Sequence, residues 1–342
     1  MLEIDGSAGE GGGQVLRTSL ALAVATGRSV RIRNVRAKRP QPGLKPGHVA
    51  AALALAELSG GRLDGAEIGN DVVTLDLDDA RPPTRDEFAF RIGTAGPVTL
   101  LAQAILPACV VMDRPVTLHL EGGTDVAWAP RWDAYVAGHL SWLQRCGIDI
   151  EATLGRRGFF PAGGGRVTFA LGRRVAPARL DATHKARQPR IEGHIAMHGL
   201  PRHVAARCRD AVADAGLLVQ AWHEDSHRGP GTGFALTLVA RERDSVWCAD
   251  VVGRKGVPVE RLAKDCVRTL RLDLDRGAGV DIHQADQLPS LLALGVGGTF
   301  TTRQLSGHAR TVLDLIPRFL PTLEVDVTTL ASGLLHVDIR HA

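Results

Sequence analysis

The chain has 342 residues, enough for about two domains at the usual ~150 residues each, so a peptide-sized or disulfide-stapled scaffold is excluded. Its 41 Lys and Arg residues against 37 Asp and Glu residues give a net charge of +4, and its 44% hydrophobic and 23% charged residues are typical of a soluble globular protein. Disorder is excluded, and a protein that coats nucleic acid with its whole surface is disfavoured.

Neither the cysteines nor the apolar segments indicate a secreted or membrane protein. The five cysteines form an odd set without a C-x-x-C pair, which fits neither a disulfide framework nor a zinc knuckle. The segment from Met1 to Gly6 carries acidic residues where a signal peptide needs a basic region. Glycines and prolines interrupt the longest uncharged stretch, Ile92 to Met112, so it predicts a buried helix rather than a membrane span. We therefore expect a cytoplasmic protein.

Two Gly-rich turns that each precede an apolar segment predict a repeated α/β unit. Gly6-Ser7-Ala8-Gly9 comes before the segment from Val15 to Ala25, and Gly93-Thr94-Ala95-Gly96 comes before the segment from Val98 to Val111. The remaining periodic segments predict a helix at His48 to Leu58 and strands at Val30 to Arg33, Asp71 to Leu77 and Val116 to Leu120. A helix at Asp286 to Leu294 and a strand at Thr299 to Arg303 indicate a third copy.

The sequence between about Ala182 and Gly277 has a different pattern and reads as a complete small α/β module. Its predicted strands are Arg190 to Met197, Leu217 to Trp222, Gly233 to Ala240 and Ser245 to Val251, and its predicted helices are Arg202 to Ala215 and Pro258 to Leu272. The flanks, Arg173 to Gln188 and Asp275 to Gly279, have the composition of linkers. We predict an α+β fold with α/β-type repeats. About three βαβαββ-like units form a large domain, residues 1–181 and 277–342, into which a smaller α/β domain, residues 182–276, is inserted.

A Gly-rich loop and a basic segment together predict an anion site. Gly9-Glu10-Gly11-Gly12-Gly13-Gln14 lies between a strand and a helix, where backbone amides attract anions, although it matches neither the Walker A loop nor the dinucleotide fingerprint. From Gly11 to Ala56 there is no acidic residue, whereas eight are basic: Arg17, Arg28, Arg31, Arg33, Arg36, Lys38, Arg39 and Lys45. The alternative is a tight turn with solvated charges. We favour phosphate or RNA-backbone binding, because forked arginine side chains suit phosphate oxygens.

His308 differs from the other twelve histidines in its setting. It follows Ser306-Gly307 and precedes an apolar-periodic run through Val312, Leu315 and Ile316, which predicts the first turn of a helix. The positive end of the helix dipole favours a neutral imidazole there and attracts phosphate. A neutral imidazole nitrogen is a competent nucleophile toward phosphorus, although a histidine with a purely structural role is the commoner case.

Several separated motifs occur in order along the chain. The most specific is Arg157-Gly158-Phe159-Phe160-Pro161-Ala162-Gly163-Gly164-Gly165-Arg166-Val167, and the others lie at Asp5 to Arg17, Arg36 to Leu44, Gly122 to Asp125 and Ala285 to Gln287. Together they resemble the RNA 3'-terminal phosphate cyclase family, whose signature is R-G-x-x-P-x-G-G-G, over essentially the whole chain. The resemblance implies an ATP-dependent ligase that converts an RNA 3'-phosphate to a 2',3'-cyclic phosphate. It implies a covalent histidine-AMP intermediate, then an RNA-(3')pp(5')A intermediate, with release of pyrophosphate and AMP.

The resemblance also implies roles for residues at matching positions. His308 would be the nucleophile, and Glu10 would hold a divalent metal, Mg or Mn. The positions that match phosphate-binding residues are Arg17, Arg36, Arg39 and His48. The positions that match nucleotide-binding residues are Gln14, Gln103, Pro130, His283, Gln284, Ala285, Asp286 and Gln287. The implied partners are ATP and an RNA 3'-phosphate end, with no membrane, and a homodimer is an open option.

Three positions depart from the family pattern. His283 stands where relatives often carry Tyr, which weakens stacking on adenine, Gly47 replaces a Gln before His48, and Gly307 replaces a Cys before His308. One alternative is a non-catalytic RNA-binding or ribosome-assembly homologue of the same fold, but those homologues lack the nucleophilic histidine. The other is an unrelated transferase that handles phosphorylated small molecules on a similar repeated fold.

Overall fold

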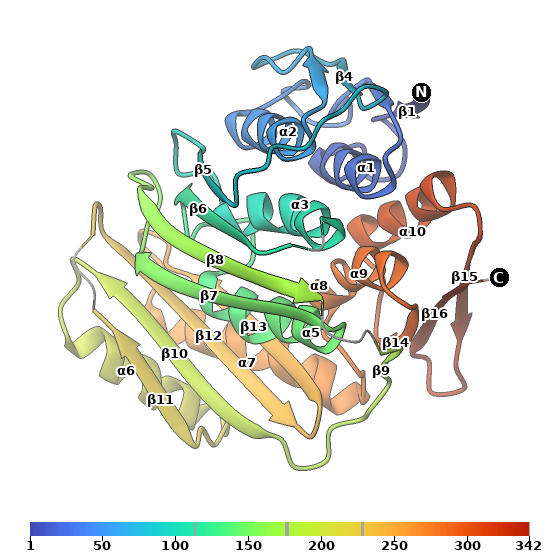
Figure 1. The fold of residues 1–342 in the computed structure, drawn as a ribbon. Helices are drawn as coiled ribbons and strands as arrows, with labels where there is room; N and C mark the ends of the chain where they lie inside the picture. Colours follow the sequence, from blue (N-terminus) through green and yellow to red (C-terminus); the bar gives the residue numbers. More distant parts are fainter. Residues whose placement is uncertain (113, 175–177, 227–228, 342) are drawn as a thin grey trace.

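The computed structural model describes residues 1–112, 114–174, 178–226 and 229–341 (Figure 1). Its first unit contains two strands that alternate with two helices, followed by a hairpin of two more strands. The elements are β1 (Leu2–Asp5), α1 (Gly13–Thr26), β2 (Val30–Arg33), α2 (Pro46–Ser59), β3 (Arg62–Asp64) and β4 (Val73–Asp76). The strands form a sheet in the order β1-β2-β4-β3, in which β1 and β2 are parallel and the other neighbours are antiparallel.

The second unit repeats this topology with a longer helical segment in its second connection. Its elements are β5 (Glu87–Arg91), α3 (Val98–Val111), β6 (Val116–Gly122), α4 (Trp132–Ala134), the π-helix η1 (Tyr135–Leu140), α5 (Ser141–Arg145), β7 (Ile148–Arg156) and β8 (Gly165–Arg174). The order β5-β6-β8-β7 and the parallel pairing of β5 with β6 match the first sheet.

The third unit has the same strand order, although a long insertion separates its first strand from its first helix. Its elements are β9 (Leu180–Ala182), α8 (Ile282–Ala285), α9 (Leu288–Leu294), β14 (Gly298–Thr302), α10 (Gly307–Phe319), β15 (Leu323–Thr329) and β16 (Leu335–His341). The sheet runs β9-β14-β16-β15, and β9 pairs in parallel with β14. This third occurrence of one topology confirms the predicted α+β fold of repeated units.

The segment between β9 and α8 forms a sheet and a hydrophobic cluster of its own. Its elements are β10 (Arg190–His198), α6 (His203–Asp214), β11 (Ala221–Asp225), β12 (Gly233–Glu242), β13 (Ser245–Val252) and α7 (Val259–Arg276). Side chains of β10 and β12 pack with α6 and α7 around Ile195, Leu238 and Leu270. We call this segment the inserted module; the boundaries at residues 182 and 276 stay a prediction.

Three local predictions are wrong, each for a physical reason. The predicted strand at Leu217 begins only at Ala221, because the Leu217 N–H donates to the Val212 carbonyl and closes the end of α6. The predicted linker around residue 180 contains β9, which is only three residues long and gives no periodic signal. The helix predicted from Asp286 begins only at Leu288, because Pro289 near the start of α9 has no N–H with which to continue the preceding turn.

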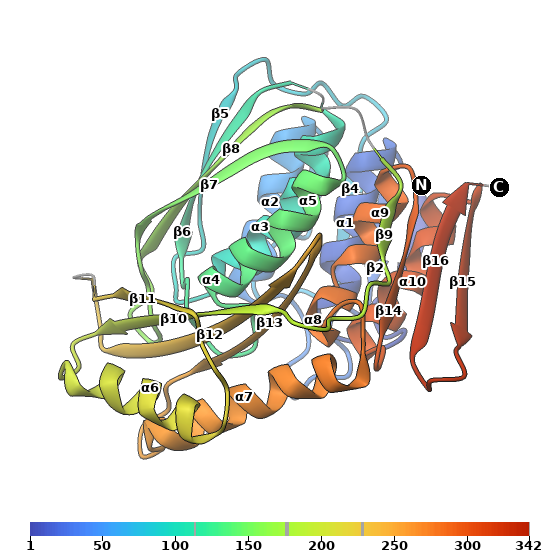
Figure 2. The same cartoon turned by 90° about the horizontal axis from the view of Figure 1, so that it is seen from below.

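The helices of the repeated units pack together in the interior and leave their sheets outside (Figures 1 and 2). Helix α1 contacts α2, α3 and α10, and the buried side chains that join them include Leu20, Leu55, Ile105 and Val312. This packing brings the N-terminus of α10 beside the loop that precedes α1. Among the described residues, no helix combines the length and apolar character needed to cross a membrane.

Candidate active site

The loop between β1 and α1 touches the first turn of α10, about 300 residues later in the sequence. The Glu10 N–H donates to the Thr311 hydroxyl over 3.2 Å, and that hydroxyl donates to the Gly307 carbonyl over 2.7 Å. Gly9 has a φ of 56°, and a Cβ there would lie 2.3 Å from the same hydroxyl oxygen. Only glycine permits this close approach, so the loop sequence itself allows Glu10 and His308 to meet.

His308 lies in the first turn of α10, as its flanking residues predict. The Ser306 hydroxyl accepts the N–H groups of His308 and Ala309 and donates to the Asp286 carboxylate over 2.5 Å. The ring nitrogen Nδ1 of His308 is buried 3.3 Å from a Glu10 carboxylate oxygen. Since the side chain as a whole is 44% exposed, solvent reaches the opposite edge of the ring, which carries Nε2.

Glu10 is an ionised carboxylate held among cations. Its side chain is 10% exposed, lies 3.3 Å from Nδ1 of His308 and forms an ion pair with Arg39, which also donates a short hydrogen bond to it. Burial raises the pKa of Glu10, but the contacts with His308 and Arg39 outweigh that effect and lower the pKa below its usual value. The carboxylate therefore carries its charge throughout the neutral range.

The side chains of Arg17 and His48 both lie close to Gly13 at the N-terminus of α1. A Cβ on Gly13 would lie 2.3 Å from Nε2 of His48 and 2.9 Å from a terminal nitrogen of Arg17. Burial lowers the pKa of His48 to about 3, and Arg17 and Arg36 add to the shift, so the ring is neutral. His48 Nδ1 accepts the Lys45 N–H over 3.1 Å, which leaves the ring proton on Nε2 as a donor beside the helix N-terminus.

The guanidinium groups of Arg17 and Arg36 are each fixed by hydrogen bonds to neighbouring protein oxygens. Arg17 donates to the Gln14 side-chain oxygen over 2.8 Å, and burial lowers its pKa to about 10. Arg36 has a left-handed backbone with φ of 58° and donates to the carbonyls of Gln41 and Gly43, both over 2.7 Å. Arg17, Arg39 and His48 thus lie against the Gly-rich loop, and Arg36 is near enough to interact electrostatically with Glu10. The four predicted phosphate-binding residues are called the basic cluster below: Arg17, Arg36, Arg39 and His48.

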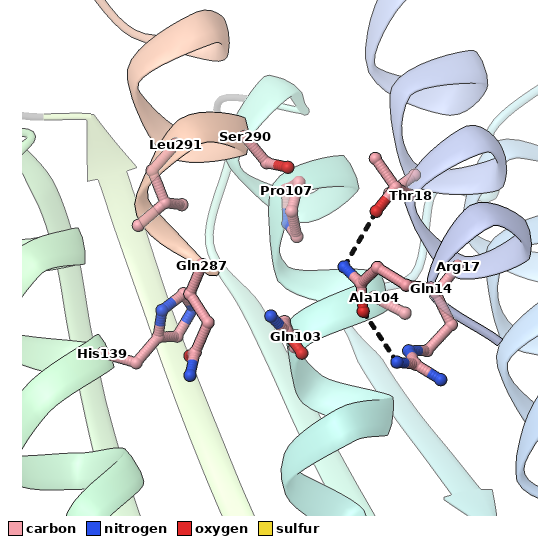
Figure 3. A pocket seen from close by; sticks show the side chains of 11 residues that line it. Gln14, Arg17, Thr18, Gln103, Ala104, Pro107, His139, Gln287, Ser290 and Leu291 are labelled. Atoms are coloured by element: carbon pink, nitrogen blue, oxygen red, sulfur yellow. Dashed lines mark hydrogen bonds between the residues drawn. The ribbon is translucent and has the colours of Figure 1, made fainter. Parts of the chain in front are cut away.

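A small cavity beside the basic cluster gathers three of the predicted nucleotide-binding residues (Figure 3). Gln14 from α1, Gln103 from α3 and Gln287 before α9 line it, together with Arg17 and His139. The cavity volume is about 20 Å³, room for about one water molecule. Several buried polar atoms that face this region have no partner: Arg17 Nε, both ring nitrogens of His139 and the Gln287 side-chain oxygen. An unpaired buried polar atom costs free energy, so this cavity suits a polar ligand.

The other predicted nucleotide-binding residues are only partly brought to the site. Asp286 reaches it through Ser306, whereas His283 is exposed on α8 and the Pro130 carbonyl accepts the Thr99 hydroxyl over 2.9 Å. Gln284 and Ala285 point into the interior instead. The Gln284 amide donates to the Val246 carbonyl and accepts from the Trp142 indole, and Ala285 is fully buried.

Three residues of the site were not predicted. Ser306 is a common N-cap type directly before a helix, so the capping rule could have identified it. Thr311 gives no separate signal, because its role depends on contact with a loop at the other end of the chain. His139 lies in the π-helix η1, and π-helical turns are frequent at functional sites, but no sequence pattern announces one.

The glycine-rich signature segment joins the inserted module to the second unit. Arg157, whose side chain is 7% exposed, forms ion pairs with Asp125 at 3.1 Å, Asp133 at 3.0 Å and Asp225 of β11 at 2.6 Å. The neighbouring Phe159 packs with residues of β10 and β12 in a small buried cluster. The segment therefore has a structural role between two sheets.

Comparisons with known proteins give one consistent result. A family model described as RNA 3'-terminal phosphate cyclase matches residues 8–325. The chain is similar to proteins named RNA 3'-terminal phosphate cyclase from Hyperthermus butylicus, at 38% identity over 95% of this chain and 93% of the relative, and from Nitrosospira multiformis, at 40% over 94% and 92%. A relative of the same name from Pyrococcus furiosus is 36% identical over 93% of both chains.

Proposed function

This chain belongs to the RNA 3'-terminal phosphate cyclase family, and on that premise we propose that it is an ATP-dependent enzyme that closes an RNA 3'-phosphate onto the neighbouring 2'-hydroxyl. The observation that carries the proposal is the position of His308. One ring edge rests against the Glu10 carboxylate, and the other is open to solvent close to the basic cluster.

The contact with Glu10 suits a histidine that attacks phosphorus. In the first step, Nε2 of His308 forms a bond to the α-phosphorus of ATP, the bond to the β-phosphate oxygen breaks, and pyrophosphate leaves. The ring becomes positively charged as the bond forms, with its proton on Nδ1, and the nearby carboxylate stabilises that charge. The hydrogen bonds from His308 and Ala309 to Ser306, and from Ser306 to Asp286, fix the start of α10 and thus the position of the ring.

The basic cluster would orient the charged oxygens of both substrates. Arg39 and Arg17 supply positive charge, and the neutral His48 ring supplies a proton donor at the N-terminus of α1, where anions are stabilised. Glu10 fits a hard divalent cation, because it is an ionised carboxylate beside the expected phosphates. When bound, Mg²⁺ or Mn²⁺ would neutralise phosphate charge there.

Two further transfers complete the proposed reaction. An oxygen of the RNA 3'-phosphate attacks the phosphorus held by His308, so that AMP passes to the RNA and the ring nitrogen leaves. The ribose 2'-oxygen then attacks the 3'-phosphorus, its proton is released, and AMP departs. This last step is intramolecular, for which effective molarities on the order of 10⁵ M or more are known, so the residues need only orient the ends and stabilise charge.

Labelling with α-³²P-ATP and a divalent metal tests the nucleophile directly. The wild-type protein should retain an acid-labile, base-stable label, and His308→Ala should lose it. His119→Ala is a matched control, because this half-exposed histidine on β6 contacts Glu87 of β5 and Thr168 of β8 in the sheet of the second unit, so the variant should keep the label. Label that persists in His308→Ala contradicts the assignment.

The same preparation separates the enzyme from an RNA-binding assembly factor of the same fold. A binding factor would form no AMP adduct and would bind RNA in a salt-dependent way, without regard to a terminal phosphate. An enzyme should convert a 3'-phosphate end to a cyclic phosphate and leave a 3'-hydroxyl end unchanged.

A further inference from the structure

Two histidines and one glutamate meet on the inserted module, outside the candidate active site. Glu192 and His194 lie two residues apart on β10, so their side chains leave the same face of the strand. His223 of the parallel neighbour β11 is in register with His194. One possible ligand atom from each of the three side chains lies within 4.8 Å of the others.

This face is the one that α6 and α7 leave uncovered. Ile191 and Ile195 alternate with the cluster on β10 and pack with the two helices, and Trp222 lies over Gly193 on that same helical side. On the opposite side, the rings of His194 and His223 stack with their centroids 4.7 Å apart. Glu192 and His194 are half-buried, whereas His223 is exposed, so solvent reaches the cluster from one direction.

We infer that Glu192, His194 and His223 form a binding site for a transition-metal ion of the Zn²⁺ class. Two imidazoles and one carboxylate are a common Zn²⁺ ligand set, which leaves a fourth position for water. With bonds of about 2.1 Å in a tetrahedron, ligand atoms lie about 3.4 Å apart, so the rings need to turn out of their stack by small side-chain rotations.

The surroundings favour a cation. Asp133 lies near enough to act electrostatically on His194, and Asp225 leaves β11 on the same face as His223. Both carboxylates pair with Arg157. Glu192 itself pairs with Arg190 at 3.4 Å, but that arginine is 65% exposed, and an exposed pair of this kind is weak enough to give way to a metal.

The ion would tie β10 to β11 next to Arg157, where the inserted module meets the second unit.

Calorimetric titration of tag-free, EDTA-stripped protein with Zn²⁺ tests the site. The Glu10→Gln background removes the carboxylate of the candidate active site, so binding there is not counted. One equivalent of Zn²⁺ should bind in that background. His194→Ala and His223→Ala should each weaken binding on the order of 100-fold or more, since even outer-shell changes cost 10- to 100-fold.

His203→Ala is the matched control, because it removes an exposed histidine from α6 of the same module and should leave Zn²⁺ affinity unchanged. X-ray absorption of the unmutated protein loaded with one equivalent of Zn²⁺ should show two imidazole ligands, and this measurement does not depend on how a variant folds. Unchanged affinity in both His194→Ala and His223→Ala, or absorption without histidine ligands, would overturn the inference.

Discussion

A substitution at Arg157 tests whether the signature segment stabilises the fold. Its guanidinium joins three carboxylates, of which Asp125 is fully buried. Methionine has a similar length and no charge, so Arg157→Met leaves the Asp125 carboxylate without its cation in the protein interior. Removing one partner of a buried ion pair costs about 3–5 kcal/mol of the free energy of unfolding.

The destabilisation should depend on pH in a defined direction. Burial already raises the pKa of Asp125, and Arg157 is the main influence that lowers it. Without Arg157 the folded-state pKa rises further, while the unfolded value stays near 3.8. Asp125 then loses its proton at a lower pH in the unfolded chain than in the folded protein. The free energy of unfolding therefore falls as pH rises above the unfolded value. The deficit of Arg157→Met relative to wild type should therefore be larger at pH 7.5 than at pH 5.

Urea unfolding at the two pH values measures this effect, with Arg166→Met as the matched control. Arg166 belongs to the same signature segment, but its pair with Glu121 at 3.0 Å is on the surface, where its side chain is 60% exposed. Surface pairs contribute about 0–1 kcal/mol, so the control should unfold close to wild type. Equal losses in the two variants, or a deficit for Arg157→Met that does not change with pH, would refute the reasoning.

Three further predictions concern glycine and two buried ionisable groups. Gly13→Ala places a Cβ 2.3 Å from Nε2 of His48 and should slow protein labelling by ATP on the order of 100-fold. The control Gly47→Ala has open space around its new Cβ, so it should keep the labelling rate and raise the free energy of unfolding in urea by about 0.5 kcal/mol. Burial lowers the pKa of His139 to about 3, so only the unfolded chain takes up a proton as pH falls below the ordinary value of 6.5, and the folded state loses stability. The free energy of unfolding of His139→Leu relative to wild type should therefore rise by about 2 kcal/mol from pH 8 to pH 5. A difference that does not depend on pH contradicts this. Burial and the nearby Asp281 raise the pKa of Asp273 to about 7, so the folded state loses stability as pH rises from 3.8 through 7. From pH 5 to pH 8, the thermal unfolding temperature of Asp273→Asn should therefore fall less than that of wild type. An equal fall in both proteins argues against the raised pKa.

The repeated fold could be predicted from the sequence because each unit carries a local signal. Glycine-rich turns before apolar helices mark the first two units, and α3 has the bounds that its apolar run predicts. What could not be predicted is pairing over long sequence distances. The three residues of β9 are too few for a periodic pattern, and their partner strand β14 lies beyond the whole inserted module.

The site could be predicted only as far as residue types and helix ends reveal it. The basic segment and the helix start at His308 are local patterns, so both were visible. The position of Gln284 was not, because its side chain is held by a buried indole and a backbone carbonyl from two other elements. Likewise, the partners of Arg157 come from three separate segments, so its ion pairs could not be predicted from the signature motif.

The contact between the first loop and α10 also has a consequence for biosynthesis. A ribosome completes α1 and the basic cluster long before it makes α10, so a nascent chain carries this positive surface before it carries His308, the proposed nucleophile. The strand β9 likewise lacks its partner until β14 has been synthesised, and long-range strand pairings of this kind form slowly. On the proposed function, translation products that end before α10 would bind phosphate without forming an AMP adduct, so activity would first appear only after His308 has been made.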